Sequence, residues 1–306
     1  MHSDGGWIVL ESKPVDTALA APTAVRRLAD KYGFTFRKSL GQNFLIDGNI
    51  LRKIIQIAEI DKADTVIEVG AGIGTLTRAL GSTAGCVLAL EVDRRLEPIL
   101  QETVGHYDNV EVIWEDALKL DWSRFQELYG LSHVKFVANL PYYITSPLLV
   151  NLFQESSFLE SITVMVQREV GERFTAEAGT KAYGTLTVLA GYYSEVEICQ
   201  IVPPTVFMPP PDVESAVVKF TLRPFEVEAV DPALFWTTVK AAFSQRRKTL
   251  ANSLASSLRP SVSKTAIGTI LHSCGISPER RAETLTVRDF VVLANELAAF
   301  VLGDDK

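Results

Sequence analysis

The stretch VIEVGAGIGTLTRAL, residues 66–80, narrows the possible folds of this chain more than any other. An apolar run typical of a buried strand enters a glycine-rich turn, and helix-type sequence follows at once. Gly70, Gly72 and Gly74 let the backbone turn sharply and approach a ligand closely. This order is typical of an open parallel sheet, whose ligands bind beyond the carboxyl ends of its strands. A glycine loop alone is a weak signal, because many such loops are only tight turns.

The rest of the first two thirds of the chain continues the alternation of strand and helix. Helix-type sequence separates successive β-rich runs, which predicts a parallel sheet covered by helices on both faces. The predicted strands are 65–70, 86–92, 110–114, 134–139 and 161–167, and the helices between them are TLTRALGS, RRLEPILQETV and SPLLVNLFQ.

The character of the sequence changes near residue 225, where RPFEVEAVDP is rich in proline and charge. Beyond it, apolar residues recur at spacings of three and four, as in helices. We therefore predict an N-terminal extension over 1–35 with one helix at TAVRRLADKYG, an α/β domain over 36–225, and a helical domain over 226–306.

Charge and cysteine content restrict the partners that this chain can have. The net charge of −7 disfavours general affinity for nucleic acid, so any such binding must come from local clusters, Arg37–Lys38 and Arg246–Lys248. Three widely spaced cysteines predict neither disulfides nor a zinc site and fit a reducing cytoplasm. No apolar run reaches the roughly 18 residues of a membrane helix, and we expect no membrane, no metal and a monomer.

Two carboxylates follow the next predicted strands. Glu91, at the end of 86–92, is placed to accept both hydroxyls of a ribose, and Asp116, after 110–114, is placed to accept from an adenine amino group. The G-x-G-x-G spacing differs from the G-x-G-x-x-G of a pyrophosphate binder. It favours an adenosine ligand without phosphates, such as S-adenosylmethionine, with Glu68 near its charged methionine end. A dinucleotide dehydrogenase is the alternative, but the sequence shows no hydride-transfer constellation.

The fourth predicted strand runs into NLPYY, which is rigid, polar and aromatic at once. The side-chain oxygen of Asn139 and the backbone carbonyl of Leu140 can each accept one N–H of an adenine amine, so that the nitrogen lone pair points at a methyl donor. Pro141 fixes the chain so that both acceptors stay aimed, and Tyr142 offers a face for the base. Orientation and electrostatic complementarity would then supply most of the rate.

Several stretches in order resemble the ribosomal RNA adenine dimethyltransferase family over roughly residues 37–300. They are GQNFLID (41–47), VIEVGAGIGTLT (66–77), EVDRRL (91–96), EDAL (115–118), NLPYYITSPLL (139–149), VQREVGERF (166–174), KAYGTL (181–186), PPTVFMPPPDVESAVV (203–218) and FSQRRKTLANSL (243–254). The resemblance implies a Rossmann-like, class I S-adenosylmethionine-dependent methyltransferase with a small all-helical C-terminal domain. It also implies the substrate, two adjacent adenines in the 3′-terminal hairpin loop of small-subunit ribosomal RNA, each dimethylated at N6 within the 30S subunit or its precursor.

The resemblance also implies roles for individual residues. Cofactor contacts would be Asn43, Leu45, Gly70, Gly72, Glu91, Asp116 and Asn139; the base pocket would be Leu140, Pro141, Tyr142 and Phe207; and the RNA surface would include Arg37, Lys38, Arg246, Arg247 and Lys248. The sequence before residue 35 lies outside the family pattern. Alternatives are a large-subunit enzyme of the macrolide-resistance type, a ribosome-assembly factor with incidental catalysis, and a DNA adenine methyltransferase, for which the helical tail is too short to read duplex sequence.

Overall fold

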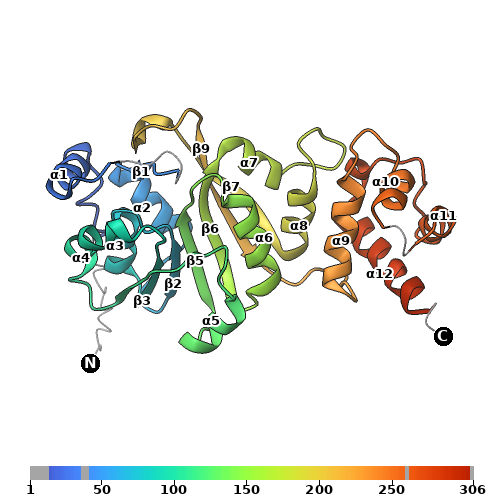
Figure 1. Cartoon of the computed structure of the whole chain (residues 1–306), viewed down its shortest axis with the longest axis horizontal. Helices are drawn as coiled ribbons and strands as arrows, with labels where there is room; N and C mark the ends of the chain where they lie inside the picture. Colours follow the sequence, from blue (N-terminus) through green and yellow to red (C-terminus); the bar gives the residue numbers. More distant parts are fainter. Residues whose placement is uncertain (1–13, 36–40, 259–261, 304–306) are drawn as a thin grey trace, which may run out of the picture.

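The computed structural model describes residues 14–35, 41–258 and 262–303. Its centre is a seven-stranded sheet in the order β4–β3–β2–β5–β6–β9–β7, seen almost edge-on in Figure 1. The strands are β2 (Thr65–Val69), β3 (Cys86–Leu90), β4 (Val110–Ile113), β5 (Val134–Asn139), β6 (Leu159–Gln167), β7 (Ser194–Val202) and β9 (Ser215–Leu222). The five strands predicted from the sequence, β2 to β6, are confirmed and run parallel.

The expectation of a wholly parallel sheet is wrong at one edge. β9 pairs antiparallel with both β6 and β7, and neither β7 nor β9 was predicted. The proline-rich segment after β7 returns the chain beside β6 without the helical crossover that a parallel neighbour requires. Only the second half of β9, VKFTL (218–222), alternates apolar and polar residues as a half-buried strand does.

Helices cover both faces of the sheet, as predicted. Val66 of β2 belongs to the apolar core shared with α2 (Gly48–Ile57), α3 (Thr75–Thr83) and α4 (Glu97–Val104). The next residue, Ile67, belongs to the core shared with α5 (Trp122–Tyr129), α6 (Thr145–Glu155) and α8 (Thr185–Tyr193). Because successive side chains of a strand point to opposite faces, one buried strand supplies both cores. Other short elements include α7 (Arg168–Phe174) and the 3₁₀ helices η2 (Arg94–Leu96), η3 (Pro204–Val206) and η4 (Ala282–Thr284).

The start of α3 shows why the glycine turn needs glycine. Gly74 caps this helix with a φ of 87°, in the left-handed region. A Cβ atom at Gly74 would lie 2.8 Å from the side chains of Thr103 and Val104 on α4. The turn therefore lets α3 pack closely against α4, while the preceding loop stays at the edge of the sheet.

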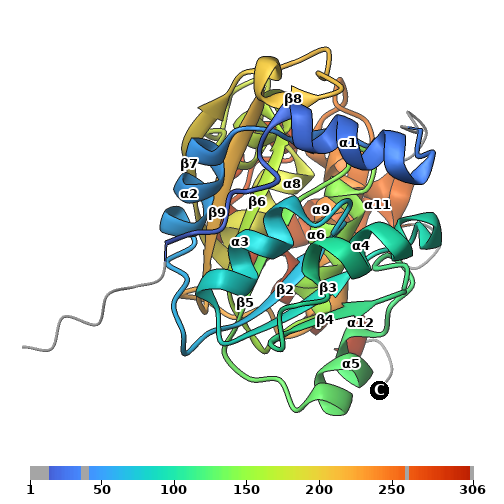
Figure 2. The same cartoon turned by 90° about the vertical axis from the view of Figure 1, so that its left-hand side faces the viewer.

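The described part of the N-terminal segment is packed against the α/β core. Its helix α1 (Pro22–Tyr32) ends at Gly33, as predicted, and buries Val25 and Leu28. Figure 2 shows α1 beside α4, where Lys31 Nζ and Tyr32 Oη both donate to Glu102. A separate two-stranded ladder joins β1 (Phe44–Leu45), which follows this segment, to β8 (Phe207–Met208).

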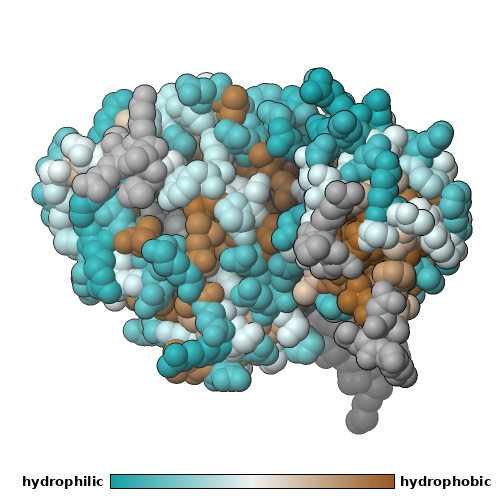
Figure 3. All heavy atoms as spheres, turned by 45° about the vertical axis from the view of Figure 1, so that its right-hand side comes forward, coloured by the Kyte–Doolittle hydropathy of each residue, from teal (hydrophilic) through white to brown (hydrophobic). Residues whose placement is uncertain are grey.

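The C-terminal part is helical and has its own apolar core. It consists of α9 (Pro232–Phe243), α10 (Leu250–Ser257), α11 (Lys264–Ser273) and α12 (Val287–Gly303), and it lies at the end of the molecule remote from α1 (Figure 1). The surface in Figure 3 is mostly hydrophilic, with apolar atoms in hollows between polar side chains. The helical run from residue 232 to 257 is broken at residues 244–249, where QRRK lies. The domain boundary at residue 225 stays a prediction.

None of the helices in residues 14–35, 41–258 and 262–303 combines the length and apolar character of a membrane span. Within the same residues, His, Cys, Asp and Glu side chains do not gather in groups of three or more that could hold a metal ion.

Candidate active site at the carboxyl edge of the sheet

A cavity of about 100 Å³ lies at the carboxyl ends of β2, β3 and β5, next to the turn after β4. The segment 41–44 forms its remaining wall. Carboxylates, asparagines and two turns from distant parts of the sequence therefore meet at one edge of the sheet. The predicted site residues in its wall are Asn43, Gly70, Gly72, Glu91, Asp116, Asn139, Leu140, Pro141 and Tyr142.

Glu91 is the most firmly held carboxylate of the cavity. Its Oε2 accepts the backbone N–H of Gly72 at 2.8 Å, and its Oε1 accepts those of Val92 and Asp93 at 2.9 and 2.8 Å. Burial raises the pKa of the Glu91 carboxyl even though these three hydrogen bonds oppose the shift. A carboxylate oxygen can accept more than one hydrogen bond. Oε2, with a single partner here, can therefore still accept a ligand hydroxyl.

Asp116 lies in the turn after β4. Its Oδ1 accepts the N–H of Leu118 at 3.1 Å, and its Oδ2 is 3.3 Å from Lys119 Nζ, an ion pair exposed to solvent. Exposed pairs of this kind contribute little to stability. The Asp116 carboxylate can therefore exchange Lys119 for a ligand donor at small cost.

Glu68 does not line the cavity. The residue is 1% exposed in β2, and its place near the methionine end of a cofactor stays a prediction. Burial, together with the negative charge of Glu91, raises the pKa of Glu68 to about 8. Its Oε2 has no hydrogen-bond partner, which suits a neutral carboxylic acid.

Asn139, the last residue of β5, is oriented by the opposite wall. Its Nδ2 donates to the backbone carbonyl of Asn43 at 3.1 Å, so Oδ1 is the atom of the amide that can accept a hydrogen bond. The next turn packs on the glycine loop, because a Cβ atom at Gly70 would lie 3.6 Å from Pro141 Cδ. The glycine-rich loop after β2 and the NLPYY turn after β5 are therefore neighbours in the structure.

Tyr142 is positioned through its hydroxyl group. Tyr142 Oη and Ser215 Oγ, at the start of β9, are 2.8 Å apart. Ser215 is fully buried, and burial also raises the pKa of the half-buried Tyr142. The antiparallel strand that the sequence interpretation missed therefore supplies the anchor of this aromatic ring.

Two predicted site residues are not in the cavity wall. Leu45 and Phe207 face each other in the β1–β8 ladder, and each is 3% exposed within the apolar core. The prediction that they contact the ligands is not supported by this geometry. The alternation along β1 places Phe44 in the cavity wall instead. A Cβ atom at Gly72 would lie 2.8 Å from the Phe44 ring, so a larger residue at position 72 would clash with Phe44.

Sequence reasoning missed other residues of the wall. Val92 and Tyr143, each next to a predicted residue, line the cavity and are 55% and 57% exposed. An apolar residue directly after a functional carboxylate, and a second tyrosine after Tyr142, were visible in the sequence. Both residues follow strand ends, where the sequence pattern does not show whether a side chain lines a cavity or faces solvent.

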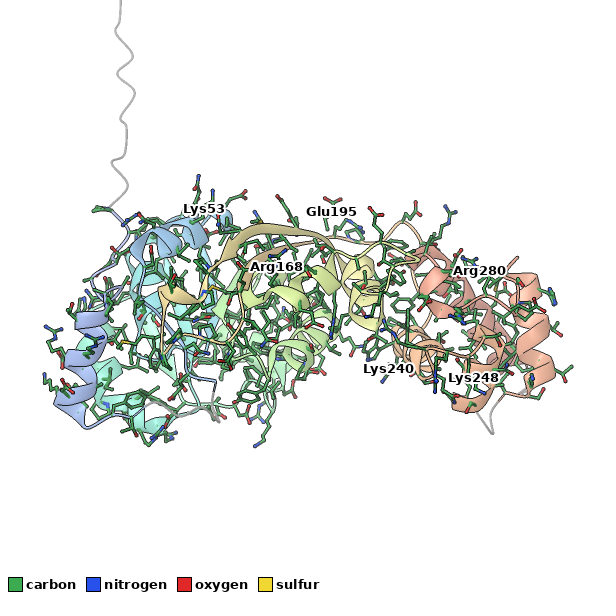
Figure 4. The ribbon with its side chains drawn as sticks, turned by 90° about the horizontal axis from the view of Figure 1, so that it is seen from above. Lys53, Arg168, Glu195, Lys240, Lys248 and Arg280 are labelled. Atoms are coloured by element: carbon green, nitrogen blue, oxygen red, sulfur yellow. The ribbon has the colours of Figure 1, made fainter. Side chains whose placement is uncertain are left out.

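The predicted RNA surface is described only in part. Arg37 and Lys38 lie outside the described residues. Arg247 and Lys248 are exposed between α9 and α10, and Figure 4 shows Lys248 on the helical part, away from Arg168. Arg246 has a second role, because its Nη2 donates to the carbonyls of Lys181 and Tyr183 at 3.0 and 2.9 Å.

The fold and the strand-end site together define a Rossmann-like methyltransferase with a helical C-terminal part. The family model described as "Ribosomal RNA adenine dimethylase" matches residues 33–299. The chain therefore belongs to the ribosomal RNA adenine dimethylase family, which confirms the resemblance seen in the sequence.

Individual proteins agree with this assignment. "Ribosomal RNA small subunit methyltransferase A" of Staphylococcus carnosus (strain TM300) is 50% identical over 286 residues, which cover 92% of this chain and 97% of that protein. A dimethyladenosine transferase from Plasmodium falciparum has a TM-score of 0.70 at 27% identity, covering 82% of this chain and 95% of that one. The 23S rRNA methyltransferase ErmE has a TM-score of 0.61 at 26% identity, covering 84% and 100%.

The same coverage corrects one expectation about the N-terminus. The family model begins at residue 33, as the sequence interpretation implied. The staphylococcal protein, however, aligns with more of the chain than residues 33–306 can supply. At least part of the preceding segment is therefore shared with relatives.

Proposed function

We propose that this chain transfers methyl groups from S-adenosylmethionine to N6 of two adjacent adenines in the 3′-terminal hairpin loop of small-subunit ribosomal RNA. Membership of the family makes it a ribosomal RNA adenine dimethyltransferase. The observation that carries the choice of subunit is the 50% identity, over nearly the whole chain, to a protein named for the small subunit. The large-subunit alternative is supported only by the weaker likeness to ErmE.

The residues of the cavity fit an adenosine cofactor. The strand-end carboxylates of Glu91 and Asp116 are the groups that would hold its ribose hydroxyls and its adenine amine. Gly70 and Gly72 have positive φ values and let the backbone approach it, and Asn43 completes the wall. S-adenosylmethionine, when bound, supplies a methyl group on a positively charged sulfur.

Asn139 and Leu140 would orient the target amine. Because Nδ2 of Asn139 is held by the carbonyl of Asn43, Oδ1 remains to accept one N–H of the adenine amine. The Leu140 carbonyl would accept the other, which directs the nitrogen lone pair toward the methyl group. Pro141 fixes the backbone between these acceptors. The amine needs no prior deprotonation, so the residues contribute by orientation rather than by general base catalysis.

Tyr142 would stack on the target base. Its ring is oriented by the Oη–Ser215 Oγ contact, and bases removed from a stack are commonly bound by aromatic side chains. Phe207 would have to leave the core to close the other face. We therefore assign the base pocket to Leu140, Pro141 and Tyr142 alone.

We place the RNA contacts outside the cavity on the helical part, with Arg247 and Lys248 on phosphates. The substrate would be the small subunit or its precursor, which places the protein in the cytoplasm, and nothing in the proposal requires more than a monomer. An intact base pocket would serve no purpose in a pure assembly factor. We therefore propose methylation as the main function and a role in subunit assembly as secondary.

The decisive experiment incubates the protein with labelled S-adenosylmethionine and unmethylated small subunits, then maps the labelled nucleosides. We expect label in N6-methylated adenosines of two adjacent positions near the 3′ end. Naked large-subunit RNA is the parallel substrate. Label in a single adenine of that RNA, with none in small subunits, would contradict the proposal. Comparing subunit maturation in Glu91→Ala cells with a deletion strain then tests the assembly role.

A further inference from the structure

The size of the cavity limits how it can hold its ligand. At about 100 Å³, it is smaller than the ~300–1,000 Å³ of ordinary small-molecule sites. A ligand the size of adenosine must therefore extend into the mouth and contact the side chains there. Among the exposed large hydrophobic side chains of the described residues, Val92 and Tyr143 line this cavity.

Two consecutive tyrosines at the mouth have different surroundings. Tyr142 is anchored at β9 through Ser215. Tyr143 is close to the segment 41–44, because a Cβ atom at Gly41 would lie 3.7 Å from its Cδ1. Tyr143 lines the same cavity as Asp116 and Glu91. Partial burial and then the negative charges of these two carboxylates raise the pKa of Tyr143.

We infer that Tyr143 is a positioning residue that covers the nucleoside half of the bound cofactor on the open side of the cavity. The inference rests on the proposed function, because it takes Glu91 and Asp116 as the groups that hold the ribose and the adenine. The tyrosine ring supplies the apolar cover that a cavity of this size lacks. Val92, directly after Glu91, presents a second apolar surface to the same ligand.

A competing role for Tyr143 is to stack on a nucleotide that flanks the target adenine. The surroundings of its ring disfavour that role. Asp116 and Glu91 are negatively charged when ionised, and a phosphate of the RNA backbone next to them would be repelled. The same carboxylates are acceptors for hydroxyl and amino groups, which the nucleoside offers.

The test measures binding of S-adenosylhomocysteine by calorimetry, in the absence of RNA. Removing one aromatic contact in Tyr143→Ala should weaken binding by about three- to tenfold, and Tyr143→Phe should restore it because the ring is retained. Leu128→Ala is the matched control, since Leu128 is 76% exposed on α5 and does not line the cavity. Thermal unfolding of each variant reports whether the fold is kept.

Steady-state methylation of small subunits separates the two roles. We expect Tyr143→Ala to raise the KM for S-adenosylmethionine and to leave the KM for the subunit unchanged. Unchanged binding of S-adenosylhomocysteine in Tyr143→Ala, or a rise confined to the KM for the subunit, would overturn the inference. Failure of the wild-type protein to bind S-adenosylhomocysteine would instead refute the proposed function itself.

Discussion

The cavity at the sheet edge and the cleft beside the helical part hold their polar groups in opposite ways. In the cavity, Glu91 is held by three backbone N–H groups and Asn139 by a backbone carbonyl. The cleft, of about 540 Å³, is lined by long charged side chains, among them Arg173, Lys181 and Arg246. Backbone groups therefore orient both cavity residues, whereas in the cleft they orient Arg246, and Arg173 pairs with another exposed side chain.

This difference follows from the backbone that carries each region. Turns beyond the strand ends, and the segment 41–44 beside them, present backbone N–H and C=O groups that the sheet ladder does not use, and these groups orient Glu91 and Asn139. The cleft is built from α7, α8 and α9 and from the loops beside them, where Arg173 pairs with Glu169 at 2.5 Å on the surface. Chemistry needs fixed geometry, whereas a flexible polyanion can be bound by mobile charges. Single substitutions should therefore have large effects in the cavity and small, additive effects in the helical part.

The largest effect is expected at Asn139. Asn139→Ala removes the Oδ1 acceptor and the link to Asn43, and we expect kcat for methylation to fall by about 10²–10³, the usual cost of one oriented polar group at a reacting centre. Steady-state methylation of small subunits at saturating S-adenosylmethionine measures kcat, and single-turnover reactions isolate the chemical step. Asn49→Ala, an exposed amide on α2, is the control. Full turnover by Asn139→Ala would show that the cavity does not depend on oriented groups.

A second test concerns the carboxylate that orients the glycine loop. Glu91→Gln replaces an acceptor of three backbone hydrogen bonds with a neutral amide. We expect S-adenosylhomocysteine to bind about 10- to 100-fold more weakly, since hydrogen bonds to charged groups contribute ~1.5–3 kcal/mol. Calorimetry measures this, and RNA affinity should be unchanged. A loss of RNA affinity of equal size would mean that the two regions are not separate.

The sequence contains enough to place the cavity but not to complete it. Gly70, Glu91 and Asn139 lie at or directly after strand ends, and Asp116 lies in the turn after β4. The rule that parallel strands present their carboxyl ends at one edge brings them together. Leu45 and Phe207 lie in the apolar core rather than in the cavity wall, and their ligand contacts stay a prediction. Both residues of β1 are buried, so residue type alone could not say that Phe44 rather than Leu45 lines the cavity. Phe44 and Tyr143 were missed because their roles depend on contacts with segments distant in the sequence, Gly72 and Gly41.

The C-terminal part shows the same limit. Apolar spacing predicted its helices, yet the break at residues 244–249 was missed, because Ser244 ends α9 without a glycine or proline. Arg246 was assigned to RNA on its charge alone. Its hydrogen bonds to Lys181 and Tyr183 join residues more than sixty positions apart, and no local pattern reveals them.

The third test asks whether the buried cavity region makes stability depend on pH. The pKa of Glu68 is about 8 in the folded protein, against about 4.3 in an unfolded chain. Between these values the native state holds a proton that the unfolded state has lost. The free energy of unfolding should therefore fall as pH rises from 5 to 8, by up to about 1.4 kcal/mol per pH unit from this group.

Glu68→Gln should remove that slope. The variant should match the wild type near pH 5 and be more stable near pH 8, as measured by urea unfolding at several pH values. Glu127→Gln, an exposed carboxyl on α5, is the control and should leave the slope unchanged. Parallel curves for the wild type and Glu68→Gln would mean that Glu68 is ionised in the fold.

The smallest effects are expected in the QRRK segment, residues 245–248. They should distinguish Arg246 from Arg247 and Lys248. Arg247→Ala and Lys248→Ala should each weaken binding to small subunits several-fold and make the salt dependence shallower by about one unit of slope. Neither should change the unfolding temperature, because both side chains are exposed. Arg246→Ala should lower the free energy of unfolding by about 1–2 kcal/mol, since it loses two hydrogen bonds to backbone carbonyls. Filter binding across a salt series and thermal unfolding measure the two properties. If all three variants behaved alike in both assays, Arg246 would be an RNA contact like its neighbours and not a link between the helical part and residues 181–183.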